Sequence, residues 1–230
     1  MRTYRAPAHE VRVYERAADV EELNKALLVF VRNTSSAHRT QARQIQQKFD
    51  RPNNPHGTFY YAGFYEEDKV IGFAMFGYYP RRRILIFDHM TIDARHRKHR
   101  SFYIFAALLQ DCVEELCPDY DFAVAEIGTD PVFTQDEING VALVRLLRQV
   151  GFGRVQMKYS LANMEPRSYR HRIKAALMVR GAQRMTQIRA EELLDIYEVI
   201  LFEHYPWFTD FVGNQVVAYE KHLKDLFSRT

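Results

Sequence analysis

Basic side chains gather in a short segment that joins two apolar stretches of the chain. The segment follows the apolar run ending at Ile92, precedes a helical run beginning at Phe102, and carries Arg95, Arg97, Lys98, Arg100 and Ser101. The N-terminus of a helix presents unpaired backbone N–H groups and the positive end of the helix dipole, and both favour a bound phosphate. We therefore interpret the segment either as a pyrophosphate site or as a solvated basic turn.

Three side chains in two apolar segments have the chemistry of general acids and bases. Glu126 lies near the end of FAVAEIG, and a carboxylate in apolar surroundings has a raised pKa, closer to what a base needs at neutral pH. The alternative is a strand-end carboxylate that faces water. Asp88 and His89 are neighbours in ILIFDHMTID, and because side chains alternate along a strand, we expect only one of them to face a site. Another possibility is that one is structural and neither is catalytic.

The two cysteines do not indicate a metal site. Cys112 and Cys117 lie five positions apart in a helical pattern, so their side chains point about 140° apart. No His or carboxylate with the spacing of a zinc site lies nearby. We expect two ordinary helix cysteines and no metal.

Composition excludes several classes of protein. The chain has 230 residues, of which 47% are hydrophobic, and a net charge of +3. Disordered, collagen-like and small disulfide-rich proteins are excluded. The sequence has no apolar run of about 18 residues, so it predicts no membrane span. The N-terminal residues lack the apolar region of a signal peptide, so we expect a cytoplasmic protein with no membrane partner.

The apolar patterns predict an α+β fold with a mixed, mostly antiparallel central sheet flanked by helices. We expect strands at 11–15, 58–65, 70–79, 84–93, 122–128 and 153–164, and helices at 20–31, 37–49, 102–116 and 139–150. These elements form one domain, residues 1–165.

After Pro166 we predict only helices, at 168–187, 190–204 and 214–227, which form a C-terminal helical extension, residues 166–230. Residues 167–189 are basic and residues 190–210 are acidic. The two stretches are interpreted either as an antiparallel helix pair with complementary surfaces or as a face for a charged partner.

Three stretches of the chain resemble the GNAT superfamily of acyl-CoA-dependent N-acyltransferases, over residues 10–164. FDHMTIDARHRKHRSFYIFAALL is similar to the family's fourth strand, pyrophosphate loop and following helix. FAVAEIG stands at the fifth strand, and NGVALVRLLRQVGFGRVQMKYSL resembles the last core helix and closing strand, with the pair Gly151–Phe152. The resemblance implies transfer of an acetyl or other acyl group from acyl-CoA to a primary amine of a small molecule or protein.

The resemblance also assigns residues to the two substrates. The backbone of Met90, Thr91 and Ile92 would bind the pantetheine arm, with Ile92 contributing a donor to the thioester oxyanion. The pyrophosphate would lie at Arg97, Lys98, His99, Arg100, Ser101 and Phe102. Glu126 is the first candidate for the base, ahead of Asp88 and His89.

The chain departs from the family pattern at three positions. Arg97 matches the first residue of the loop motif, but Arg100 and Phe102 stand where the family has small residues. Leu147 stands where a tyrosine commonly protonates the leaving thiolate.

Other functions stay open. An acyl carrier protein, which is acidic, is an alternative donor that would meet the basic residues at 81–83 and 95–100. The missing glycines and Leu147 also fit a non-catalytic interaction module with a GNAT-like fold. The small net charge argues against nucleic-acid binding through residues 96–100. A sheet edge and a helical appendage make a homodimer reasonable.

Overall fold

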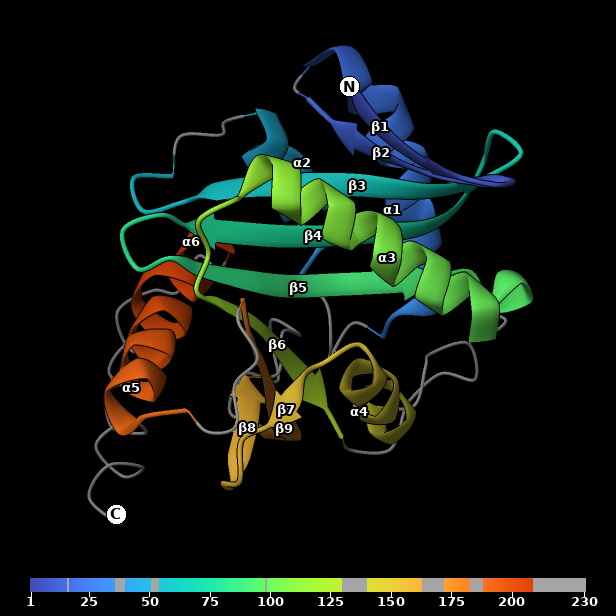
Figure 1. The fold of residues 1–230 in the computed structure, drawn as a ribbon. Coiled ribbons are helices and arrows are strands. Elements are labelled where there is room, and N and C mark those ends of the chain that lie inside the picture. Colours follow the sequence, from blue (N-terminus) through green and yellow to red (C-terminus); the bar gives the residue numbers. More distant parts are fainter. Residues whose placement is uncertain are drawn as a thin grey trace.

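The computed structural model describes residues 1–15, 17–35, 40–50, 54–97, 99–129, 140–162, 172–182 and 188–208, and within them the strands form one sheet (Figure 1). The strands are β1 (Arg2–Ala6), β2 (His9–Tyr14), β3 (Thr58–Glu66), β4 (Lys69–Tyr79), β5 (Ile84–Ile92), β6 (Phe122–Gly128), β7 (Gly153–Arg154), β8 (Tyr159–Ala162) and β9 (Arg172–Gly181). Their order is β1-β2-β3-β4-β5-β6-β9-β7, and β8 also pairs with β9. Only β5 and β6 run parallel among these described pairs, so the predicted mixed, mostly antiparallel α+β fold is confirmed.

Helices cover both faces of the sheet. They are α1 (Val20–Asn33), α2 (Ala42–Asp50), α3 (His99–Leu116), α4 (Gly140–Gln149), α5 (Ala190–Glu198) and α6 (Tyr205–Phe208), with the 3-10 turns η1 (Ala17–Asp19) and η3 (Ala94–His96) and the π-helix η4 (Val199–His204). Apolar side chains of α3 and α4 pack on one face, and those of α1, α2 and the segment from α5 to α6 pack on the other (Figure 1). No helix in the described ranges is long and apolar enough to cross a membrane.

The strand β5 contains a β-bulge. Two consecutive residues of β4 pair with Phe87 and His89, so Asp88 between them is an extra residue in β5. The parallel ladder between β5 and β6 also ends at Phe87, although both strands continue beyond it. The two strands therefore diverge in the middle of the sheet, as Figure 1 shows.

The helix predicted at 168–187 is wrong, because residues 172–181 form β9. This strand pairs with β6 on one side and with β7 and β8 on the other. Ala176 and Met178 pack in the layer of α3 and α4, whereas Leu177 and Val179 pack in the layer of α5. A strand that is buried on both faces shows no alternation of polar and apolar residues, so its sequence does not differ from that of a buried helix. Residues 172–181 thus belong to the same sheet as the strands before them.

The other C-terminal expectations have mixed outcomes. The single strand expected at 153–164 is divided into the short strands β7 and β8. The helix expected at 190–204 is confirmed as α5 and η4, and with α6 it forms the C-terminal helical part of the fold. The helix expected at 214–227 lies outside the described residues.

The acidic residues of α5 have partners that the sequence did not suggest. In the described part of the chain, Asp195 and Glu198 bind Arg82, in the turn between β4 and β5, and the distance from Arg82 Nη2 to Glu198 Oε2 is 2.7 Å. The expected pair of basic and acidic helices is therefore wrong, because the basic stretch supplies a strand. The α5 charges instead attach the C-terminal helices to the sheet.

Candidate active site

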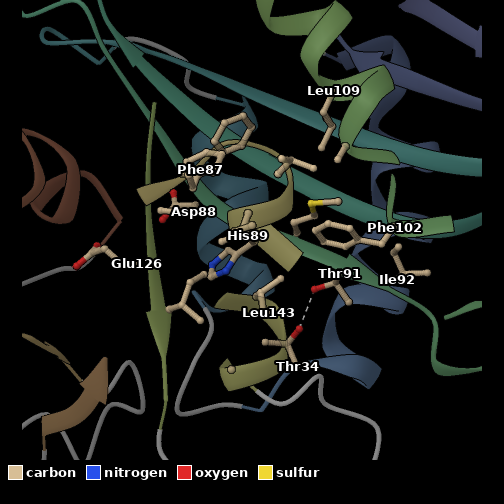
Figure 2. Close-up of a pocket in the computed structure, with 18 of the residues that line it drawn as sticks. Thr34, Phe87, Asp88, His89, Thr91, Ile92, Phe102, Leu109, Glu126 and Leu143 are labelled. Carbon is tan, nitrogen blue, oxygen red and sulfur yellow. Dashed lines mark hydrogen bonds between the residues drawn. The ribbon is translucent and has the colours of Figure 1, made fainter. Parts of the chain in front are cut away.

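A cavity of about 380 Å³ lies where β5 and β6 diverge. Phe102 and Leu143 line it from the layer of α3 and α4, and Thr34 lines it from the end of α1, so the cavity passes through the sheet (Figure 2). Most of its wall is apolar and includes Phe87, Leu109, Leu147 and Phe152. The divergence of two strands, rather than a set of small side chains, makes this opening.

Glu126 lines the cavity and is held by two tyrosines. Tyr205 donates from its hydroxyl to Glu126 Oε2 at 2.7 Å, and Tyr159 donates to Oε1. Burial raises the pKa of Glu126 above its usual range, and the two hydroxyl donors oppose that rise. A carboxylate with a raised pKa is a stronger base than an exposed one. The water-facing alternative for Glu126 does not describe this geometry.

Asp88 lines the same cavity and is bound to the C-terminal segment. His204 Nε2 lies 2.8 Å from Asp88 Oδ1, and His204 Nδ1 lies 2.8 Å from the hydroxyl of Tyr79. Both His204 and Tyr79 are buried, with exposed fractions of 1% and 0%. In Figure 2 the carboxyl groups of Asp88 and Glu126 both point toward the C-terminal segment, which supplies His204 and Tyr205.

His89 also lines the cavity, so the expectation that only one of Asp88 and His89 faces a site is wrong. The bulge at Asp88 interrupts the alternation, and both side chains contact elements on the same face of the sheet. His89 packs on Phe30 of α1 with ring centroids 4.7 Å apart, and its Nε2 accepts from the backbone N–H of Thr40 at 3.2 Å. These contacts give His89 a structural role in the wall of the cavity.

The residues expected to bind the pantetheine arm follow the bulge. Met90, Thr91 and Ile92 line the cavity, and their backbone is not paired with β6. Thr91 is buried and its hydroxyl lies 2.9 Å from that of Thr34. Arg97 Nε donates to the carbonyl of Ile92 at 2.8 Å, so the Arg97 side chain folds toward the cavity.

The remaining residues of the expected pyrophosphate loop lie at the start of α3. Lys98 is outside the described residues, and α3 begins at His99. Arg100 is exposed, whereas Ser101 and Phe102 are buried, with exposed fractions of 8% and 5%. Because Phe102 turns into the core, its bulk does not cover the N-terminus of α3.

Four residues of the site were missed by the sequence analysis: Tyr79, Tyr159, His204 and Tyr205. Two of them come from the segment that we interpreted as an appendage. The adjacent polar and aromatic residues at 204–207 are the signal that could have indicated a buried role. Within the described ranges, no three His, Cys, Asp or Glu side chains form a group suited to a metal ion.

No family model and no curated protein matches this sequence. Solved structures do match. A putative GNAT-family acetyltransferase from Bacteroides thetaiotaomicron has a TM-score of 0.58 and 14% identity, over 84% of this chain and 98% of that chain. The ribosomal L7/L12 α-N-protein acetyltransferase RimL, in complex with coenzyme A, has a TM-score of 0.54 and 12% identity, over 78% and 98%. An acetyltransferase from Salmonella typhimurium that modifies the N-terminal serine of L7/L12 has a TM-score of 0.50 and 12% identity, over 77% and 97%.

Proposed function

This chain has the fold of the GNAT acetyltransferases, and from that premise we propose that it is an N-acyltransferase that transfers an acetyl group from acetyl-CoA to a primary amine. The observation that carries the proposal is the cavity between β5 and β6, with Glu126 in its wall. A half-buried carboxyl group held by two hydroxyl donors fits the base that the reaction needs.

The donor binds along β5. The backbone of Met90–Ile92 hydrogen-bonds the pantetheine arm, because these residues have no partner on the β6 side. Arg97 donates a hydrogen bond to the carbonyl of Ile92. When the pantetheine arm binds, its own hydrogen bond to this carbonyl replaces that of Arg97. The pyrophosphate lies at the N-terminus of α3, where Arg100 is exposed and Phe102 is turned inward.

The reaction requires a neutral amine. Glu126 takes a proton from the acceptor, and the amine nitrogen attacks the thioester carbonyl carbon. The carbonyl oxygen becomes an oxyanion, and a backbone N–H of β5 stabilises it. The N–H of Ile92 is the first candidate for this donor. The C–S bond then breaks, the positively charged nitrogen of the intermediate loses one proton, the thiolate takes up one proton, and the products are an amide and free coenzyme A. Leu147 is buried beside the cavity and has no proton to give, so the thiolate is protonated by another group or by solvent.

The structure favours coenzyme A over a carrier protein as the donor. The basic residues at 81–83 were one of the two surfaces expected to meet an acidic carrier, and those at 95–100 were the other. Arg82 binds Asp195 and Glu198, and Arg83 binds Asp121 at 3.0 Å. These partners neutralise much of the positive charge that would steer a carrier protein to this turn.

The test is calorimetric titration with acetyl-CoA, followed by an acetylation assay with a panel of primary amines. We expect wild-type protein and Glu126→Gln to bind acetyl-CoA equally, with turnover about 100- to 10,000-fold slower in the variant. Asp111→Asn, which removes an exposed carboxylate of α3, is the matched control and should keep full activity. Binding without turnover of any amine would point to the non-catalytic module, and absence of binding would point to the carrier protein.

A further inference from the structure

Two further residues hold Asp88 in place, although the proposed mechanism uses only Glu126 as the base. Its Oδ1 contacts His204, and His204 in turn contacts Tyr79, so three residues from β4, β5 and η4 form one chain of hydrogen bonds. This series of hydrogen bonds begins at the buried Tyr79 and ends at Asp88 in the wall of the cavity. This arrangement fixes the position of one carboxyl group at the wall of the cavity.

The direction of these hydrogen bonds follows from the chemistry of the partners. A carboxylate only accepts, so Nε2 of His204 carries the proton that binds Asp88. In the neutral ring Nδ1 is then an acceptor, and the hydroxyl of Tyr79 donates to it. Burial raises the pKa of Tyr79, so this hydroxyl keeps its proton. Asp88 Oδ1 thus accepts from His204, and His204 accepts from Tyr79.

The second oxygen of Asp88 has no donor beside it in the described part of the chain. Oδ2 is buried and forms no hydrogen bond with any described residue. The guanidinium groups of the cavity are engaged elsewhere, since Arg97 binds Ile92 and Asn33, and Arg180 binds Tyr120 and Gln110. A buried carboxylate oxygen without a donor is unfavourable, and a ligand that brings a donor removes this cost.

We propose that Asp88 binds a second positive charge of the acceptor, so that the preferred substrates are diamines or other amines with a second cationic group. This inference rests on the proposed function. One ammonium group of the acceptor donates to Asp88 Oδ2, while the other loses its proton to Glu126 and reacts. The bound ammonium and the reacting amine must be different groups, because an ammonium held directly by a carboxylate gives up its proton less readily. His204 acts as a positioning residue.

The test compares α,ω-diamines of three to six methylene groups with n-alkylamines of equal length. In wild-type protein we expect kcat/KM to be about 10- to 100-fold higher for the best diamine than for its matched monoamine. Asp88→Asn should bring this ratio close to one, whereas Glu126→Gln should lower kcat for both amines and keep the ratio. A wild-type ratio near one, or an unchanged ratio in Asp88→Asn, overturns the inference and leaves the proposed function in place. A wild type that binds acetyl-CoA but acetylates neither amine overturns the proposed function and this inference together.

The role of His204 has its own test. The amide of glutamine can accept from Tyr79 and donate to Asp88, so His204→Gln should keep the diamine preference, whereas His204→Leu should raise KM for the diamine about 10-fold. KM for the monoamine should stay the same in both variants. Equal changes in KM for both amines in His204→Leu would indicate a merely structural role, and so would equal effects of the two variants.

Discussion

In the proposed mechanism Glu126 is the base; burial raises its pKa, and the hydroxyl groups of Tyr159 and Tyr205 lower it. Both donate to the carboxylate, and a donor that binds the charged form lowers the pKa of the acid. Replacing either tyrosine by phenylalanine removes one donor and leaves the ring. The pKa of Glu126 then rises, and the acidic limb of the pH–rate profile moves to higher pH, because the base must be deprotonated to act.

The size of the movement follows from the energy of one hydrogen bond. A hydrogen bond to a charged group contributes about 1.5–3 kcal/mol, and one pH unit corresponds to about 1.4 kcal/mol. The midpoint should thus move upward by about one to two pH units in Tyr205→Phe, whose lost bond is 2.7 Å long in the wild type. Tyr159→Phe should move it in the same direction.

The assay is kcat against pH at saturating acetyl-CoA and amine, with Tyr197→Phe as the control. Tyr197 is a buried tyrosine that packs on Tyr159, but its hydroxyl donates to Met157 Sδ at 2.7 Å. The midpoint in Tyr197→Phe should stay at the wild-type value. If the midpoint in Tyr205→Phe is unchanged or lower, Glu126 is not the group that titrates in the reaction.

Two further predictions concern the elements that support the site. In Gly63→Ala the new methyl group would overlap the hydroxyl of Tyr14, which is bonded to Tyr65 at 2.9 Å, so thermal unfolding should show a loss of about 1–3 kcal/mol. Retention of the wild-type melting temperature would contradict this packing. Asp93 caps η3 by accepting from the backbone N–H of Arg95, and its hydrogen bond with the Arg95 side chain is the main cause that lowers its pKa to about 2. A lowered pKa stabilises the fold above pH 4, and this effect is lost as the pH falls through about 2. Asp93→Asn should therefore cost about 1 kcal/mol at pH 7 and progressively less between pH 4 and pH 2 in denaturant titrations.

The N-terminal half of the fold could be predicted from the sequence because its strands alternate or are bounded by turns. β3 and β4 are aromatic-rich segments around a short polar break, and this pattern is typical of a hairpin. β1 was missed because Arg2–Ala6 is a mostly exposed edge strand with a polar sequence. β9 was missed for the opposite reason, since burial on both faces removes the alternation that identifies a strand.

The site could be predicted only in part. Glu126 was found from its place in an apolar strand, but the bulge at Asp88 has no signature in the sequence. A bulge arises from the pairing of two strands, and this pairing is not visible along one of them. His204 and Tyr205 could not be assigned for a related reason, since about 80 residues separate them from Glu126 and only tertiary packing brings them together.

The C-terminal helices are attached to the face of the sheet opposite α3, by contacts with β3, β5 and the turn between β4 and β5. Arg82 binds α5, and Trp207 stacks on Phe59 with ring centroids 6.1 Å apart. Partial unfolding of this segment alone would withdraw His204 and Tyr205 while β5 and α3 stay in place. Such a state would still hold the donor but could not process the acceptor. On the proposed function, we therefore expect heat inactivation to be separable from melting of the sheet.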